Sequence, residues 1–203
     1  MAEVCLYVAA SLDGFLADAD GGVGWLEAFE DEYPDGEPGE NGYEAFFGTV
    51  DCLVMGANTY EQIVTEFAGD AEDRAPDADG GGDDGNGDDA AVAGWPYGDV
   101  PTYVTTHRDL PRASDAVEFF AGDVADLAAD LDAEYDTVWL VGGAALAREF
   151  VRKNLVDEIR LSIVPVLLGE GIRLFAEDGP ERSLHLVDET AFESGIVELR
   201  YAL

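Results

Sequence analysis

Positively charged side chains are scarce in this chain. Its 203 residues include 10 Lys and Arg against 45 Asp and Glu, so the formal net charge is -35 at pH 7. Proteins that bind nucleic acid use Lys and Arg to replace counterions on the phosphate backbone. A surface this acidic repels such a polyanion, and it repels anionic membranes for the same reason. We therefore expect neither nucleic acid nor a membrane as a partner.

The carboxylates are spread along the whole chain rather than gathered in one tail. Lys153 is the only lysine. Dispersed carboxylates with so little lysine are typical of proteins from salt-loving organisms, in which molar salt screens the repulsion between like charges. A halophilic protein is therefore the first interpretation. A basic partner that covers the acidic surface is the alternative.

Cysteine and long apolar runs are also rare. No stretch reaches the roughly 18 consecutive apolar residues that a membrane helix needs. The first residues show no basic region and no cleavage signal, so we expect a cytoplasmic protein. Cys5 and Cys52 each lie in an apolar, strand-like run. A buried free thiol is commoner there than a disulfide or a metal ligand, and we predict no metal site.

One segment is too polar to form a core of its own. Residues 70–94 are dense in Gly and Asp, and we interpret them as a solvated acidic insertion. A calcium loop is the alternative, although the carboxylates lack the fixed steps and the closing Glu of such loops. The chain as a whole is 47% apolar and long enough for one large core, so we predict a single domain over 1–203.

The apolar pattern predicts an α/β fold. Short β-prone runs occupy residues 4–10, 52–55, 102–106 and 137–141. Helical patterns begin near 58 and cover 123–134 and 144–153. Because strands alternate with helices, we expect a parallel sheet with helices on both faces. The last strand-like runs, 158–165, 183–187 and 196–203, have no helix between them and predict an antiparallel edge.

Two of the predicted strands end in glycine at the start of a helix. Gly56 precedes Asn58 and Thr59, and Gly142 and Gly143 precede Ala144. Glycine lets the backbone approach a ligand closely, and the first amides of a helix attract an anion. A helix cap or a tight turn that binds nothing explains either junction alone. Two such junctions in one parallel sheet favour a dinucleotide pyrophosphate site.

A third loop adds hydroxyls and a cation after another predicted strand. It contains Thr105, Thr106, His107 and Arg108. Arg108, assisted by His107, is a candidate to hold the 2′-phosphate that distinguishes NADPH from NADH. A surface ion pair with one of the many carboxylates is the alternative for Arg108.

The order of these motifs resembles the dihydrofolate reductase superfamily. The motifs are Ser11-Leu12-Asp13-Gly14-Phe15-Leu16-Ala17, Trp25, Met55-Gly56-Ala57-Asn58-Thr59-Tyr60-Glu61, the threonine loop and Val141-Gly142-Gly143-Ala144. The stretch from Leu155 to Gly171 is similar to the branch that contains the reductase domain of riboflavin biosynthesis, the C-terminal domain of the bacterial bifunctional deaminase-reductase. The resemblance spans nearly the whole chain except the acidic insertion.

This resemblance implies a mostly parallel eight-stranded sheet with flanking helices, NADPH across the strand ends, and a homodimer. It implies that the pyrophosphate lies between two groups of residues: Gly56, Ala57, Asn58 and Thr59, and Val141, Gly142, Gly143, Ala144, Ala145 and Leu146. It places the adenosine 2′-phosphate at Thr105, Thr106, His107 and Arg108, and the nicotinamide near Leu16 and Ala17. Ala57 departs from the family, which usually has a basic residue there, so more of the phosphate binding falls to backbone amides and Arg108.

The substrate half offers weaker signals. Asp13 and Glu44 are candidate proton donors, because burial raises the pKa of a carboxyl group. Bonding within its own turn explains Asp13 at least as well, and a solvated helix face explains Glu44. Trp25, Tyr43 and Phe46 are candidate apolar walls, or ordinary core aromatics.

The identity of the substrate is left open. The first basic residue is Arg74, so the loops expected around the substrate contain no cation for a phosphoribosyl group or a folate tail, although Arg173 is available from the C-terminal part. The expected activity is an NADPH-dependent reductase acting on a small heterocycle such as 5-amino-6-(5-phosphoribosylamino)uracil. A dihydrofolate or dihydropterin reductase and a non-catalytic NADPH-binding sensor are the alternatives.

Overall fold

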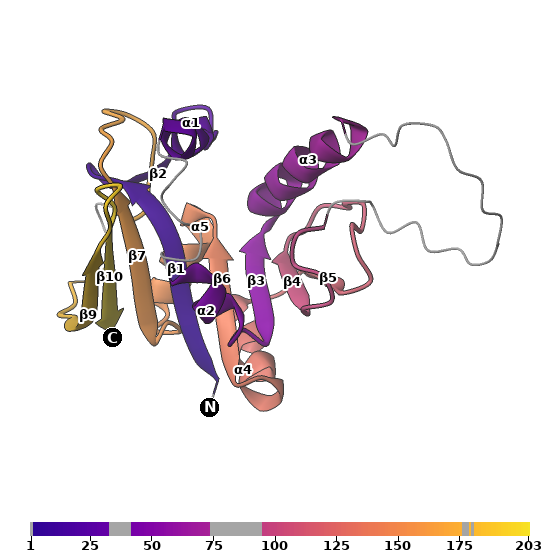
Figure 1. Ribbon diagram of the computed structural model, residues 1–203. Coiled ribbons are helices and arrows are strands. Elements are labelled where there is room, and N and C mark those ends of the chain that lie inside the picture. Colours follow the sequence, from indigo (N-terminus) through magenta and orange to yellow (C-terminus); the bar gives the residue numbers. More distant parts are fainter. Residues whose placement is uncertain (1, 33–41, 74–94, 176–178, 180) are drawn as a thin grey trace.

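An eight-stranded sheet forms the frame of the protein (Figure 1). The computed structural model describes residues 2–32, 42–73, 95–175, 179 and 181–203. The strands lie side by side in the order β5 (Val117–Phe120), β4 (Thr102–Thr105), β3 (Cys52–Gly56), β6 (Thr137–Gly142), β1 (Glu3–Ser11), β7 (Glu158–Val164), β10 (Val197–Ala202) and β9 (His185–Ala191). Neighbouring strands from β5 to β7 are parallel to each other. β10 is antiparallel to both of its neighbours, β7 and β9. The predicted α/β fold with an antiparallel edge is confirmed.

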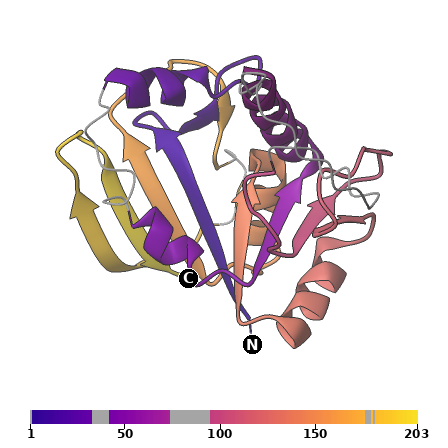
Figure 2. The same ribbon diagram turned by 45° about the vertical axis from the view of Figure 1, so that its right-hand side comes forward.

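Helices cover both faces of this sheet, because side chains alternate between the faces along each strand. On one face lie α4 (Val124–Glu134) and α5 (Ala144–Arg152), which pack on Val4, Leu6 and Val8 of β1. The other face carries α1 (Gly24–Glu32), α2 (Tyr43–Phe47) and α3 (Ala57–Asp73). Figure 2 shows α1 and α3 at the end of the sheet where the parallel strands finish.

The edge strand β5 was not predicted from the sequence, and neither were two further, very short strands. β2 (Phe15–Ala17) and β8 (Ile172–Arg173) form a small antiparallel sheet beside the main one. Gly171, with φ of 146°, lets the chain pass directly against the carbonyl oxygen of Ala17, where any side chain would collide. These strands are only 3 and 2 residues long, too short to produce a periodic pattern.

The predicted acidic insertion begins later than the sequence suggested. Helix α3 extends to Asp73, so residues 70–73 are helical and the assignment of 70–94 as one loop is wrong at its start. Residues 74–94, including the carboxylates considered for calcium, lie outside the described residues. Cys5 and Cys52 are free and buried, as predicted. Within the described residues, no helix is both long and apolar enough to span a membrane.

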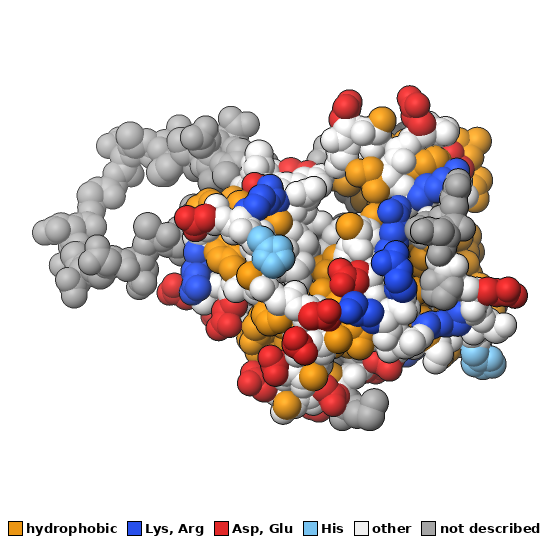
Figure 3. Space-filling view, turned by 180° about the vertical axis from the view of Figure 1, so that it is seen from behind, with side chains coloured by type: hydrophobic (Ala, Val, Ile, Leu, Met, Phe, Trp, Pro, Cys, Tyr) orange, Lys and Arg blue, Asp and Glu red, His pale blue; other side chains and the backbone are white. Residues whose placement is uncertain are grey.

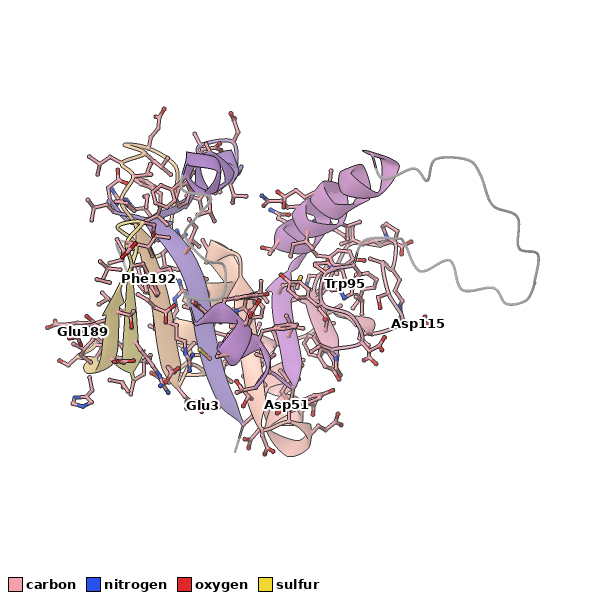
Figure 4. The ribbon with its side chains drawn as sticks, viewed as in Figure 1. Glu3, Asp51, Trp95, Asp115, Glu189 and Phe192 are labelled. Carbon is pink, nitrogen blue, oxygen red and sulfur yellow. The ribbon has the colours of Figure 1, made fainter. Side chains whose placement is uncertain are left out.

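A carboxylate at the start of β3 fixes the alignment of the central strands. Asp51 (Figure 4) accepts hydrogen bonds at Oδ2 from the amides of Asp136 and Thr137, at 3.2 and 2.9 Å. The amide of Asp51 in turn donates to the carbonyl of Thr137 at 2.9 Å. Because the amino ends of β3 and β6 are joined here, their carboxyl ends must also meet at one edge.

A buried carboxylate joins the antiparallel edge to the parallel part of the sheet. Glu158 on β7 is 4% exposed, and its two oxygens accept hydrogen bonds from Arg160 Nε and Arg200 Nε, both at 2.6 Å. Burial alone raises the pKa of Glu158, but the hydrogen bonds and positive charges of both arginines outweigh this effect and hold the pKa below its usual value. The ionised form of Glu158 therefore stabilises the fold.

We predict that Glu158→Gln lowers the free energy of unfolding by about 2 kcal/mol at neutral pH, because two charged hydrogen bonds lose their anionic acceptor. Since the folded pKa is depressed, this stabilisation is complete above the unfolded pKa of about 4.3 and is lost as the pH falls through the folded value. Denaturant unfolding in molar salt should show the gap between wild type and variant closing in acid. Glu189→Gln, on the exposed strand β9, is the control; an equal effect of both variants would contradict the prediction.

Candidate functional site

Two glycine junctions meet at the carboxyl edge of the sheet. A register shift in the β3–β6 pair places Met55 opposite Gly142. A Cβ atom built on Gly56 would lie 3.8 Å from the carbonyl oxygen of Gly142 and 3.9 Å from the amide nitrogen of Gly143. The two junctions are therefore in direct backbone contact, as the pyrophosphate hypothesis requires.

The backbone of the second junction favours glycine at Gly142 and leaves little room for a side chain at Gly143. Gly142 has φ of 126°, a backbone conformation that side chains rarely allow, and the peptide bond between Gly142 and Gly143 is cis. A Cβ on Gly143 would lie 3.1 Å from Oγ1 of Thr59. Residues of both helix starts thus line one narrow space.

The two helices that start at this edge keep their positive ends free of carboxylates. Neither α3 nor α5 has an acidic residue in its first turn, and Gly143 caps α5 without a side-chain hydrogen bond. In contrast, α4 has Asp126 in its first turn, and its cap Asp123 accepts from the amide of Ala125 at 2.7 Å. Acidic residues normally stabilise a helix start. Their absence from two starts in so acidic a chain leaves the first amides, among them those of Ala144, Ala145 and Leu146, available to an anion.

Arg108 lies beside the start of α3. Its Nη2 donates to Oδ1 of Asn58 at 2.9 Å and forms an ion pair with Glu61 at 2.7 Å. The side chain of Arg108 remains 48% exposed, and His107 is exposed as well. The structure thus shows the surface ion pair that was the alternative for Arg108, and it places that pair next to Asn58 at the proposed phosphate site.

The threonine loop joins the same edge. Thr105 Oγ1 donates to the carbonyl of Met55 at 3.3 Å, and Thr106 Oγ1 accepts from the amide of Arg108 at 2.9 Å. These bonds fix the end of β4 against the end of β3. Gly56, Ala57, Asn58 and Thr59 therefore lie between the threonine loop on one side and the Gly142–Leu146 segment on the other.

Asp13 has the contacts of a structural carboxylate. It accepts hydrogen bonds from Ser11 Oγ at 2.7 Å and from the amides of Leu168 and Gly169 at 3.2 and 2.7 Å. The hydrogen bond from Ser11, followed by those from the backbone, lowers the pKa of Asp13 despite some desolvation. These contacts favour the ionised form, whereas a proton donor has to be neutral. The structure thus favours a structural role for Asp13, which bonds within its own turn through Ser11 and also to the distant loop at Leu168 and Gly169.

Glu44 and the candidate aromatic walls lie on the face covered by α1 and α2. Glu44 is exposed on the first turn of α2, which agrees with a solvated helix face. Phe46 is 3% exposed and packs edge-on against Tyr7 and Trp139, with ring centroids 5.0 and 5.8 Å apart. Tyr43 packs against the same Trp139 at 5.7 Å.

Trp25 is not part of this aromatic group. It packs with the cluster of Phe29, Val164 and Ile196, so the structure does not unite the three proposed walls around one space. Leu16 contacts the core beneath α4 and α5, and Ala17 is buried in β2. Both follow the carboxyl end of β1, two strands away from Gly56 in the sheet order.

Arg173 is the cation that the sequence offered from the C-terminal part of the chain. This residue lies on β8, with its Cζ 4.6 Å from the ring centroid of Phe15 and its Nη1 3.4 Å from the carbonyl oxygen of Asp13. A cation thus stands beside the loop after β1. Only the pairing of β2 with β8 brings Arg173 there, and no local signal predicts such a pairing.

Comparison with known proteins identifies the family. The family model described as the RibD C-terminal domain matches residues 2–197. The Bacillus subtilis protein named "Uncharacterized protein YwjB" is 32% identical over 200 residues, 98% of this chain and 97% of that protein. The crystal structure of a "Putative riboflavin biosynthesis protein" from Shewanella sp. PV-4 superposes with a TM-score of 0.75 and 26% identity, covering 100% of this chain and 98% of that one.

A bifunctional protein shares the fold as well. The diaminohydroxyphosphoribosylaminopyrimidine deaminase/5-amino-6-(5-phosphoribosylamino)uracil reductase from Thermotoga maritima superposes with a TM-score of 0.61 and 16% identity. The match covers 99% of this chain and 56% of that protein, and at this identity it shows the fold alone. The fold is therefore that of the dihydrofolate-reductase-like reductase domains, and the chain belongs to the RibD C-terminal domain family.

Proposed function

We propose that the protein is a reductase that binds NADPH at the edge where β3, β4 and β6 end and reduces a small heterocyclic substrate. The observation that carries the proposal is the convergence of two carboxylate-free helix starts beside the contact of Gly56 with Gly142. When bound, NADPH would supply the hydride. Membership of a family of reductase domains supports the same chemistry.

The residues divide the binding of the cofactor between them. The first amides of α3 and α5 would hold the pyrophosphate, since both helix dipoles point their positive ends at it. Arg108 would hold the 2′-phosphate by a charged, fork-shaped contact. To do so it has to exchange some of its bonding to Glu61, which competes for the guanidinium at 2.7 Å. This competition predicts opposite effects of changing the two residues.

The leading substrate is a pyrimidine such as 5-amino-6-(5-phosphoribosylamino)uracil, with a dihydropterin as the alternative. Arg173 beside the β1–β2 loop supports the first, because a phosphoribosyl group needs a cation. The carboxylate of Asp13 is already held by hydrogen bonds that favour its ionised form, and Glu44 is exposed. Solvent water would therefore supply the proton that accompanies the hydride. The homodimer and the cytoplasmic location expected above stay predictions.

A direct test measures binding and turnover separately. Titration with NADPH and NADH in molar salt should show binding, with NADPH preferred. Incubation of the protein with NADPH and either the pyrimidine or dihydrofolate should then consume NADPH, measured by its absorbance, with one substrate only. Binding without turnover of either substrate would favour the alternative of a non-catalytic NADPH sensor. Absence of binding to both nucleotides would overturn the proposal.

Closing the space between the helix starts should abolish binding. In Gly143→Val, the new side chain would press against Thr59 and occupy the gap that the pyrophosphate needs. We expect NADPH affinity to fall at least tenfold, a loss of about 1.4 kcal/mol of binding free energy. Ala129→Val, at an exposed position of α4 away from the site, is the control for effects on folding. Equal affinities of Gly143→Val and wild type would contradict this geometry.

Changing Arg108 and its competitor should shift nucleotide preference in opposite directions. Arg108→Ala should lower the affinity for NADPH about tenfold and leave the affinity for NADH unchanged. The loss is near the ~1.5 kcal/mol expected of one charged hydrogen bond. Glu61→Gln should remove the ion pair that holds Arg108 and raise the affinity for NADPH relative to that for NADH. Calorimetric titration of both nucleotides gives the two ratios, with Arg112→Ala as the control for net charge. If Arg108→Ala weakens both nucleotides equally, Arg108 does not contact the 2′-phosphate.

A further inference from the structure

A pocket of about 230 Å³ lies away from the glycine junctions, between the C-terminal half of α5 and the antiparallel edge of the sheet. Its floor includes Ile159 on β7, which is 3% exposed. Its basic lining residues are Arg148, Arg152 and Arg182, and its apolar ones include Phe175, Leu184 and Leu203. Figure 3 shows basic side chains in a column on this side of the molecule, next to apolar ones.

The charge of this pocket is opposite to that of the chain. Three of the 10 basic residues line it, and no Asp or Glu among the described residues does. Like charges repel, so three arginines in one place cost free energy unless something offsets them. In a chain with 45 carboxylates, ion pairs would be the simplest offset. None of the three has an ion pair to another described residue, whereas Arg108, Lys153, Arg160 and Arg200 do.

Backbone contacts hold two of the arginines in place. Arg148 donates through Nε to the carbonyl of Leu174 at 3.1 Å and through Nη2 to the carbonyl of Arg173. Arg182 donates to the carbonyl of Val151 at 3.4 Å and to Oδ1 of Asn154. These bonds use few of the five donors of each guanidinium, and no carboxylate of the described residues forms an ion pair with either arginine. Arg152, the last residue of α5, is exposed and has no hydrogen bond within the described part of the chain.

We propose that this pocket binds a small organic anion: a phosphate or carboxylate group on a compact apolar body. The anionic group would contact Arg152 and Arg182, and the apolar body would cover Ile159, Leu184 and Leu203. Arginine suits this role, since its planar fork matches both anions and is weakly hydrated. A volume of about 230 Å³ is below the roughly 300 Å³ of common drug-sized sites, which restricts the ligand to a small molecule.

The test is calorimetric titration of the whole protein in molar salt, which screens the long-range repulsion between the acidic chain and an anion. The probes are 1-naphthyl phosphate, 1-naphthoate, inorganic phosphate and 1-naphthol. We expect one of the two naphthyl anions to bind at one site, at least tenfold more tightly than phosphate or naphthol, and the tighter anion identifies the head group. Saturating NADPH should not displace it, which separates this site from the proposed cofactor site.

Variants decide whether the arginines make the site. The affinity for the naphthyl anion should fall at least tenfold in Arg152→Gln and in the double variant Arg152→Gln, Arg182→Gln. It should fall less in Arg152→Lys. Arg112→Gln removes the same charge from an exposed loop and should leave the affinity unchanged. The proposal is overturned if no probe binds, if all variants bind equally, or if NADPH displaces the probe. It is also overturned if the arginine variants instead convert a dimer to a monomer in sedimentation, because a second copy would then fill the pocket.

Discussion

The backbone contact between Gly56 and Gly142 is the constraint on which the candidate site depends. A Cβ atom on Gly56 would lie 3.8 Å from the carbonyl oxygen of Gly142, and the φ of 126° at Gly142 is a conformation that side chains rarely allow. The contact in turn requires the register of the two strands, which Asp51 fixes at the opposite end of the sheet. The side chain of Asp51, at the opposite end of β3 from Gly56, thus helps to set how closely the starts of α3 and α5 approach each other.

Much of this arrangement follows from the sequence alone. Three strands of the parallel part, β3, β4 and β6, have apolar runs that end in glycine or threonine, so their position and direction were predictable. The proximity of Gly56 to Gly142 followed from parallel pairing, since the carboxyl ends of neighbouring parallel strands share one edge. The antiparallel edge was predictable because no helix interrupts the last three runs.

The parts that could not be predicted depend on contacts between distant residues. The β2–β8 pair joins two very short segments more than 150 residues apart, and only the folded chain shows that it brings Arg173 to Asp13. The three arginines that line the pocket come from α5 and from the chain just before β9. No local sequence pattern predicts that they lie together. Glu61 as a competitor for Arg108 also required the fold, because 47 positions separate them.

Asp13 links two loops that the sequence gives no reason to connect. Its oxygens hold the amides of Leu168 and Gly169, while Leu12 donates its amide to the carbonyl of Val166 at 2.9 Å. The loop after β1 and the loop after β7 are thereby coupled, and β2 and β8 extend the coupling to their far ends. Movement of either loop must therefore displace the other, and it has to break the bonds of one carboxylate.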